Sequence, residues 1–126
     1  MRHTTNRVRL LSHRTTGHTV LAVNGELDIA TTATLRDRIV NILKDTTTPV
    51  IVDLSGVDFC DATGLSLLLS AQRRAKLHGL TIAFAGPRPI VAKLLRITGL
   101  DQLFTVYASL AAAKAGTRGT DRSVLA

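Results

Sequence analysis

The positions of hydrophobic and polar residues near the start of the chain are typical of two short strands followed by a helix. Residues 8–12 and 19–23 are rich in Val and Leu, and a polar, glycine-containing stretch at 14–18 separates them. Two such runs joined by a short polar segment predict a β-hairpin. From Ala30 onward the period changes, because apolar residues recur at i, i+4, i+7 and i+8 until a run of threonines precedes Pro49. This spacing predicts an amphipathic helix.

Strands and helices alternate through the rest of the chain. Apolar and β-branched runs predict buried strands, and stretches with helical spacing lie between them. Because a helical connection between neighbouring strands is right-handed and makes the next strand parallel, the later strands are expected to be parallel. The sequence thus predicts an α/β fold: a mixed β-sheet with a leading hairpin and later strands parallel, covered by about four α-helices. The expected boundaries are an end of the second strand at 24–26, strands at 50–54 and 80–85, helices at 62–78, 90–98 and 109–116, and a loop at 55–60. Residues 104–107 are expected to form a short strand or an extended turn.

Length and composition fit one domain. The 126 residues are 45% hydrophobic and 20% charged, which is ordinary for a globular protein and excludes wholesale disorder. We expect a basic, flexible N-terminal tail at 1–6, one domain at 7–114 and a flexible C-terminal tail at 115–126. The sequence shows no signal peptide, no apolar run of the ~20 residues that a membrane helix needs, and a single cysteine, Cys60. A cytoplasmic protein without a membrane partner is therefore expected.

The net charge of +7 is concentrated at the two ends of the chain. Residues 1–17 and 114–126 together hold six of the seven net positive charges, and the segment between them is nearly neutral. A basic protein is a candidate for nucleic-acid binding. Aromatic residues make up only 3% of this chain, however, so platforms for stacking bases are scarce. The charge therefore indicates solvated ends more than a nucleic-acid site, and no direct nucleic-acid partner is expected.

Residue patterns of catalytic and metal sites are absent from the sequence. The four histidines lack the spacing of metal ligands, and no phosphate-binding glycine loop follows the first strand. Cys60 precedes a predicted helix start, where the helix dipole lowers a thiol pKa, but the sequence offers neither a base nor a second cysteine to work with it. We therefore expect neither enzymatic activity nor a cofactor or metal, and we interpret Cys60 as a structural thiol.

The segment 58–65 has the most unusual content. It runs from the end of a buried parallel strand directly into a helix start, and open α/β sheets meet ligands and partners at this edge. Asp61 is placed to cap the helix, and the free N–H groups of a helix start favour an anion such as a phosphorylated hydroxyl. The same spacing also fits a capped helix with small residues for packing. Spacing alone leaves both interpretations open.

Four motifs follow one another between Val20 and about Lys114: Gly25-Glu26-Leu27-Asp28, Val50-Ile51-Val52-Asp53-Leu54-Ser55, Asp58-Phe59-Cys60-Asp61-Ala62-Thr63-Gly64-Leu65 and Leu95-Arg96-Ile97-Thr98-Gly99-Leu100-Asp101. With these motifs the sequence resembles the STAS domain of bacterial anti-sigma factor antagonists. The resemblance implies a STAS-type sheet and a partner-switching role. Such a protein binds an anti-sigma factor of the GHKL serine kinase type and thereby releases a sigma factor. The kinase inactivates it by phosphorylating a Ser at the helix start.

The resemblance also implies a set of partner-binding residues. In the family, the contact surface uses the Asp of the Gly-Glu-Leu-Asp motif and the first turns of the following helix. The domain is expected to be a monomer or a weak dimer. Carried over by position, the partner-binding residues are Asp28, Asp61, Thr63, Gly64 and Leu65, with Arg73 as a further candidate.

The sequence departs from the family at the phosphorylation site. The position that carries the phosphorylated Ser is Ala62 here, which has no hydroxyl, so the usual switch does not operate there. Three consequences are open. The protein is a permanently active antagonist, or Thr63 accepts the phosphate instead, or phosphorylation is lost because the partner is a different kind of protein.

Two other function classes fit parts of the sequence. A receiver domain of a response regulator has a similar length and a similar alternation of elements. It needs an acidic pair after the first strand, however, and only Asp53 is placed as its chemistry requires. A nucleic-acid-binding module that uses the basic tails is the other alternative.

Overall fold

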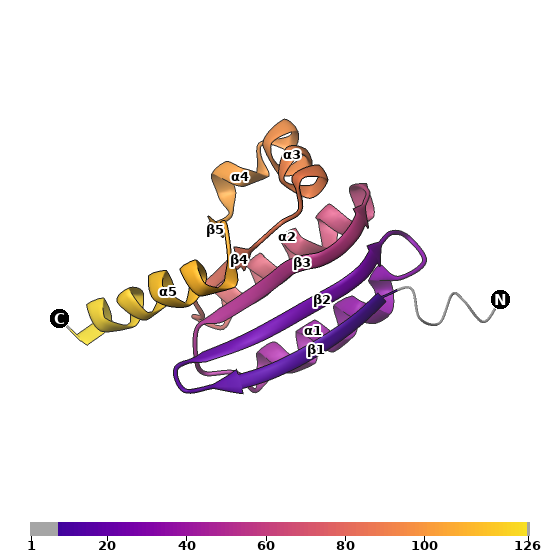
Figure 1. The fold of residues 1–126 in the computed structure, drawn as a ribbon. Helices are drawn as coiled ribbons and strands as arrows, with labels where there is room; N and C mark the ends of the chain where they lie inside the picture. The colour runs from indigo at the N-terminus through magenta and orange to yellow at the C-terminus, as the bar shows by residue number, and fades with distance from the viewer. Residues whose placement is uncertain (1–7, 126) are drawn as a thin grey trace.

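The computed structural model describes residues 8–125, with side chains described as far as Thr117, and this part of the chain forms five strands and five helices (Figure 1). The expected N-terminal tail at 1–6 lies outside the described residues. The elements are β1 (Val8–Thr15), β2 (His18–Leu27), α1 (Thr32–Lys44), β3 (Val50–Cys60), α2 (Ala62–Leu77), β4 (Ile82–Ala85), α3 (Pro89–Thr98), α4 (Leu100–Leu103), β5 (Val106–Tyr107) and α5 (Leu110–Leu125).

All five strands belong to one sheet, in the spatial order β1-β2-β3-β4-β5. β1 and β2 form the leading hairpin and are antiparallel, whereas β2 to β5 pair in parallel. The predicted mixed sheet is therefore confirmed, with five helices in place of about four. Because β2, β3 and β4 point the same way, they lead into α1, α2 and α3 at one edge, which we call the carboxyl edge. The opposite edge is the amino edge.

Helices cover the two faces of the sheet unequally. α1 and α2 lie side by side along one face (Figure 1), and α3 joins the same core cluster through Val91 and Leu95. On the other face, Ala113 of α5 packs in a smaller cluster with Val20 and Ile51. The larger core therefore lies between the sheet and α1, α2 and α3.

Both β2 and β3 are longer than the sequence predicts. The loop expected at 55–60 is wrong, because β3 continues to Cys60, and β2 runs past its expected end at 24–26 to Leu27. The extra residues of the two strands pair with each other in parallel after two shifts of register. One shift begins at Gly25, where φ is 111°, a value that glycine adopts readily. The irregular register removes the even alternation by which a strand is found in a sequence.

The last helix also extends beyond its predicted end. The sequence predicts an end at Gly116, whereas α5 continues to Leu125. Thr117 is buried, and its hydroxyl oxygen lies 2.7 Å from Nε2 of His18. Gly116 allows a close approach here, because a Cβ at this position would collide with Oη of Tyr107. These contacts hold the helix at the point where its sequence favours an end. The short helix α4 is also absent from the predicted elements.

Candidate functional site

The start of α2 is fixed at the carboxyl edge by its capping residue, Asp61. Oδ1 of Asp61 accepts hydrogen bonds from the N–H groups of Thr63 (2.9 Å) and Gly64 (3.1 Å) and from the Thr63 hydroxyl (2.6 Å). The backbone bonds satisfy donors that a helix start leaves unpaired. These hydrogen bonds lower the pKa of the Asp61 carboxyl below its usual value of 3.8, and the bond from the Thr63 hydroxyl makes the largest contribution. The predicted cap is confirmed, and its carboxylate is charged at neutral pH.

Two of the residues predicted to bind a partner are packed inside the protein. Gly64 is buried, and a Cβ at this position would lie 2.7 Å from both Sγ of Cys60 and the carbonyl oxygen of Leu27. Leu65 is 9% exposed and belongs to the larger core cluster. Gly64 therefore lets the first turn of α2 lie against the ends of β2 and β3, and Leu65 anchors that turn in the core.

The exposed side of this turn is formed by Ala62 and Ser66. Both are exposed, whereas Thr63 is half-buried and its hydroxyl is bonded to Asp61. A side chain at position 62 thus meets solvent or a partner directly. Ser66 is not among the residues predicted from the motifs, although its four-residue spacing from Ala62 indicates that both share one face of the helix.

Asp28 lies in the loop between β2 and α1, next to the start of α2. Its Oδ1 accepts a hydrogen bond from the N–H of Ala30 (2.9 Å), and its carbonyl oxygen accepts one from the N–H of Thr31 (3.1 Å). The N–H of Asp61 donates to the carbonyl of Leu27 (3.2 Å), which joins this loop to the cap of α2. The structure thus brings Asp28 and Asp61 to neighbouring parts of the carboxyl edge.

Arg73 does not join this group. It is exposed and lies ten positions after Thr63 on α2, about 15 Å along the helix axis. Its neighbours Arg74 and Lys76 are the basic residues of the last turn. Arg73 therefore lies toward the amino edge, away from the other residues predicted to bind a partner.

Three exposed apolar side chains that were not predicted from the sequence lie after β2, at the end of β3 and at the start of α3. Ile29, in the loop after β2, is 78% exposed, Phe59, near the end of β3, is 46% exposed, and Ile90, at the start of α3, is 56% exposed. Large apolar side chains that gather on a surface mark interaction sites. The sequence carries a signal for each of them: Ile29 and Phe59 directly follow an aspartate, and Ile90 directly follows the turn at 86–89.

An ion pair between β3 and the start of α3 borders the same surface. Arg88 lies 3.3 Å from Asp58, and its Nε donates a hydrogen bond to the carbonyl of Ser55 (2.8 Å). Arg88 thereby ties the segment before α3 to β3. We define the carboxyl-edge surface as Asp28, Ile29, Asp58, Phe59, Asp61, Ala62, Thr63, Arg88 and Ile90.

Cys60 lies directly beneath this surface and is buried. Burial raises the pKa of its thiol to about 11, and the negative charge of Asp61 adds to the rise. A thiol with a raised pKa is a poor nucleophile, because the thiolate is the reactive form. Its environment supports the interpretation of Cys60 as a structural thiol.

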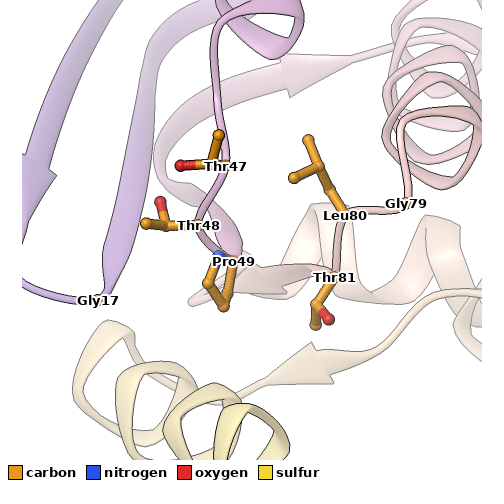
Figure 2. Close-up of a pocket in the computed structure, with 7 residues that line it drawn as sticks. All are labelled: Gly17, Thr47, Thr48, Pro49, Gly79, Leu80 and Thr81. Carbon is orange, nitrogen blue, oxygen red and sulfur yellow. The ribbon is translucent and has the colours of Figure 1, made fainter. Parts of the chain in front are cut away.

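A hollow of about 380 Å³ lies at the amino edge, at the other end of the strands from the start of α2. Figure 2 shows residues 47–49, before β3, and 80–81, before β4, lining it together with two glycines. The lining contains no titratable side chain, and the Thr48 hydroxyl is bonded to that of Thr19 (2.8 Å). Among the side chains that the structure describes, up to Thr117, no group of His, Cys, Asp or Glu is able to hold a metal ion. No helix in the described part of the chain is long and apolar enough to cross a membrane.

The fold and the carboxyl-edge surface together define an α/β domain whose exposed apolar and charged side chains suit protein binding. The family model for the STAS domain matches residues 10–113. The chain therefore belongs to the STAS domain family, and the resemblance seen in the sequence is confirmed.

Similar proteins are named as antagonists of anti-sigma factors. The anti-sigma-F factor antagonist RsfB of Mycobacterium tuberculosis (strain CDC 1551 / Oshkosh) is 30% identical over 105 residues, covering 82% of this chain and 84% of that protein. The structure of an anti-sigma factor antagonist from Mycobacterium paratuberculosis has a TM-score of 0.79 and 26% identity, covering 88% of this chain and 94% of that one. The Bacillus cell fate determinant SpoIIAA in its phosphorylated form shares the fold, with a TM-score of 0.65 and 21% identity over 85% of this chain and 97% of that one.

Proposed function

We propose that the protein is an anti-sigma factor antagonist, which binds an anti-sigma factor of the GHKL serine kinase type and thereby frees a sigma factor. The observation that carries this proposal is the start of α2, where Ala62 and Thr63 stand at the carboxyl edge beside Asp28 in a chain of the STAS family. The name of the mycobacterial relative supports the same role. The role is binding, and it involves no reaction on a substrate.

The carboxyl-edge surface combines apolar anchors with negative charge. Ile29, Phe59 and Ile90 are exposed apolar side chains that a partner buries, and a few such anchors carry most of the energy of an interface. Asp61 places a carboxylate near them, and Asp58 adds a second one that is paired with Arg88. A partner with an apolar recess bordered by Lys or Arg complements this arrangement, and the opposite charges speed the encounter.

Ala62 makes the proposed antagonist permanently active. The position is exposed and lacks a hydroxyl, so a kinase finds no acceptor where the family carries Ser. Thr63 is a poor substitute because its hydroxyl donates a 2.6 Å hydrogen bond to Asp61. A phosphate on Thr63 would bring about −1.5 to −2 charges next to that carboxylate. This repulsion supports permanent activity over phosphorylation of Thr63.

Incubation with the cognate anti-sigma kinase and labelled ATP tests the permanent activity. We expect no phosphate on the wild-type chain and an undiminished complex with the anti-sigma factor. Ala62→Ser places a hydroxyl at the exposed position, so this variant is expected to become phosphorylated and to lose binding. Phosphate on the wild-type chain that disappears in Thr63→Ala would contradict permanent activity.

Two matched substitutions test the binding surface. Ile29 and Leu77 are 78% and 79% exposed, but Leu77 ends α2 at the amino edge. We expect Ile29→Asp to weaken binding to the anti-sigma factor about tenfold or more in isothermal titration calorimetry. Leu77→Asp is expected to leave the affinity unchanged. Equal effects of the two substitutions, in variants with the circular dichroism of the wild type, would show that the carboxyl-edge surface is not the contact.

A further inference from the structure

A groove lies between the β1–β2 hairpin and α5, and its volume is about 550 Å³. Residues 12–15 of β1 form one wall, Leu110 and Lys114 of α5 form the other, and Val20 of β2 lies between them. We call this the hairpin–α5 groove. Pockets for small ligands have volumes of ~300–1,000 Å³. The groove is therefore large enough to hold a small molecule.

Buried contacts hold α5 in place beside the groove. The Thr117 hydroxyl donates a hydrogen bond to the carbonyl of Ala113 (2.8 Å), so its oxygen accepts one from Nε2 of His18 (2.7 Å). His18 and Thr117 are 5% and 2% exposed, and Ala113 is fully buried. These contacts join the start of β2 to the middle of α5. The groove is therefore formed before any ligand arrives.

The pairing of β1 with β2 shows which hairpin side chains face the groove. His13 pairs with Val20, and paired residues project on the same face of a sheet. Val20 packs in the cluster beneath α5, so His13 and, two residues later, Thr15 project on the α5 side. Arg14 projects on the other face, where its guanidinium donates to the carbonyl of Asp45 (3.5 Å). His13, Thr15 and Lys114 are thus the polar side chains of the groove.

Positive charge in the groove has no acid beside it. Lys114 is half-buried, and within the described part of the chain no acidic side chain pairs with it. The described residues that line the groove include neither Asp nor Glu. An anionic ligand in the groove would give this ammonium a charge-assisted hydrogen bond.

We propose that the hairpin–α5 groove binds a phosphate monoester that carries a small apolar group. Lys114 and His13 offer donors to the phosphate oxygens, whereas the Thr15 hydroxyl donates to the carbonyl of His18 (3.4 Å). Val20 and Leu110 contact the apolar group. A phosphate monoester carries close to two negative charges at neutral pH, so it attracts the Lys114 ammonium more strongly than the single charge of a carboxylate does. The groove is lined by other elements than the carboxyl-edge surface, so this site does not depend on the proposed function.

Titration with phenyl phosphate, followed by the amide chemical shifts of the isotope-labelled protein, tests the proposal. We expect saturable shifts at residues 12–15 and in the first turns of α5. Lys114→Gln is expected to weaken binding at least about tenfold. Lys93→Gln removes the same charge from an exposed position of α3 and is the matched control, with no expected change. Shifts that do not saturate, or an equal loss in both variants, would overturn the proposal.

Two further titrations test the chemistry and the source of the ligand. Benzoate has the same ring with a carboxylate, so benzoate that binds as tightly as phenyl phosphate contradicts the preference for phosphate. Co-sedimentation with phosphatidylcholine vesicles, with and without phosphatidic acid, separates a lipid headgroup from a soluble monoester. Retention that requires both phosphatidic acid and Lys114 supports the site with a lipid ligand, and phenyl phosphate binding without retention supports it with a soluble one. Lys114→Gln is expected to bind the anti-sigma factor like the wild type, which keeps the tests of the two proposals separate.

Discussion

Replacing Gly64 with alanine is expected to destabilise the protein, although alanine is the better helix former. The added Cβ would lie 2.7 Å from Sγ of Cys60, 2.7 Å from the carbonyl oxygen of Leu27 and 2.8 Å from Cβ of Leu27. Non-bonded carbon atoms in good contact are ~3.5–4.0 Å apart. Rotation of a side chain does not relieve this clash, because the Leu27 oxygen is a backbone atom that accepts the N–H of Asp61.

Two opposing effects set the magnitude of the change. Alanine favours a helix over glycine by ~1 kcal/mol, whereas forcing extra volume into a packed site costs ~1–3 kcal/mol. The cost for Gly64→Ala is expected near the upper end, because either the end of β2 or the start of α2 must move. The free energy of unfolding is then ~1–2 kcal/mol lower than that of the wild type.

Urea unfolding followed by circular dichroism measures this difference. With a denaturant slope of ~2 kcal/mol per molar urea, the midpoint falls by ~0.5–1 M. Ser66→Ala raises helix propensity on the exposed side of the same turn and is the control, expected to be neutral or slightly stabilising. A Gly64→Ala variant as stable as the wild type would refute the reasoning, because α2 would then shift without cost.

Three further predictions concern the α2 start and the attachment of α5. Asp61→Ala is expected to lower stability at neutral pH. Because folding lowers the pKa of this carboxyl, its stabilisation is present above its unfolded pKa (~3.9) and is lost as the pH falls through the folded value, so urea midpoints of the two proteins should converge in acid. Thr117→Val leaves the N–H of His18 without its acceptor and is expected to cost ~1–3 kcal/mol in urea unfolding, whereas Thr117→Ser keeps most of the stability. The Cys60 thiol, with a pKa of about 11 against an ordinary 9.0, is expected to react with iodoacetamide at least ~100-fold more slowly in the native protein than in urea. A constant midpoint difference at all pH values, an unaltered Thr117→Val midpoint or equal alkylation rates would contradict these expectations in turn.

Local signals explain what the sequence predicts correctly. Hydrophobic periodicity reports on one element at a time. It locates the hairpin and the helices that follow β2 and β3, and it gives the order of strands and helices along the chain. Helix capping is equally local. Asp61 and the two N–H groups whose hydrogen bonds it accepts lie within three residues of each other, so the cap is predictable before the fold is known.

Features that depend on distant partners are not predictable in this way. The last part of β3, up to Cys60, needs β2 beside it in a shifted register. The continuation of α5 beyond Gly116 is held by His18, which is 99 positions from its partner Thr117. The candidate site is likewise only partly predictable from local sequence. The motif identifies the helix start, but the rotation of α2, set by packing, decides that Gly64 faces the core and Ala62 faces outward.

The direction of the strands also decides where charge gathers. Because β2, β3 and β4 are parallel, the helices that follow them begin at the carboxyl edge and end at the amino edge. The positive ends of the dipoles of α1, α2 and α3 therefore lie at the carboxyl edge. Asp58 and Asp61 lie at that edge, and Lys44 and Lys76, in the last turns of α1 and α2, lie at the other. The net charge of +7 conceals this separation.

This separation of acidic and basic side chains explains why the residue at position 62 matters for the proposed function. A phosphate at this exposed helix start would add about −1.5 to −2 charges to an edge that already carries Asp58 and Asp61. The added charge would be compatible with the helix start, since the helix dipole favours an anion there, but it would place a strongly hydrated group on a surface that also carries the exposed apolar side chains of Ile29 and Phe59. Ala62 keeps this part of the surface apolar. In the proposed function, alanine at position 62 therefore has two effects: it offers no phosphoacceptor, and it preserves the surface that the anti-sigma factor is proposed to bind.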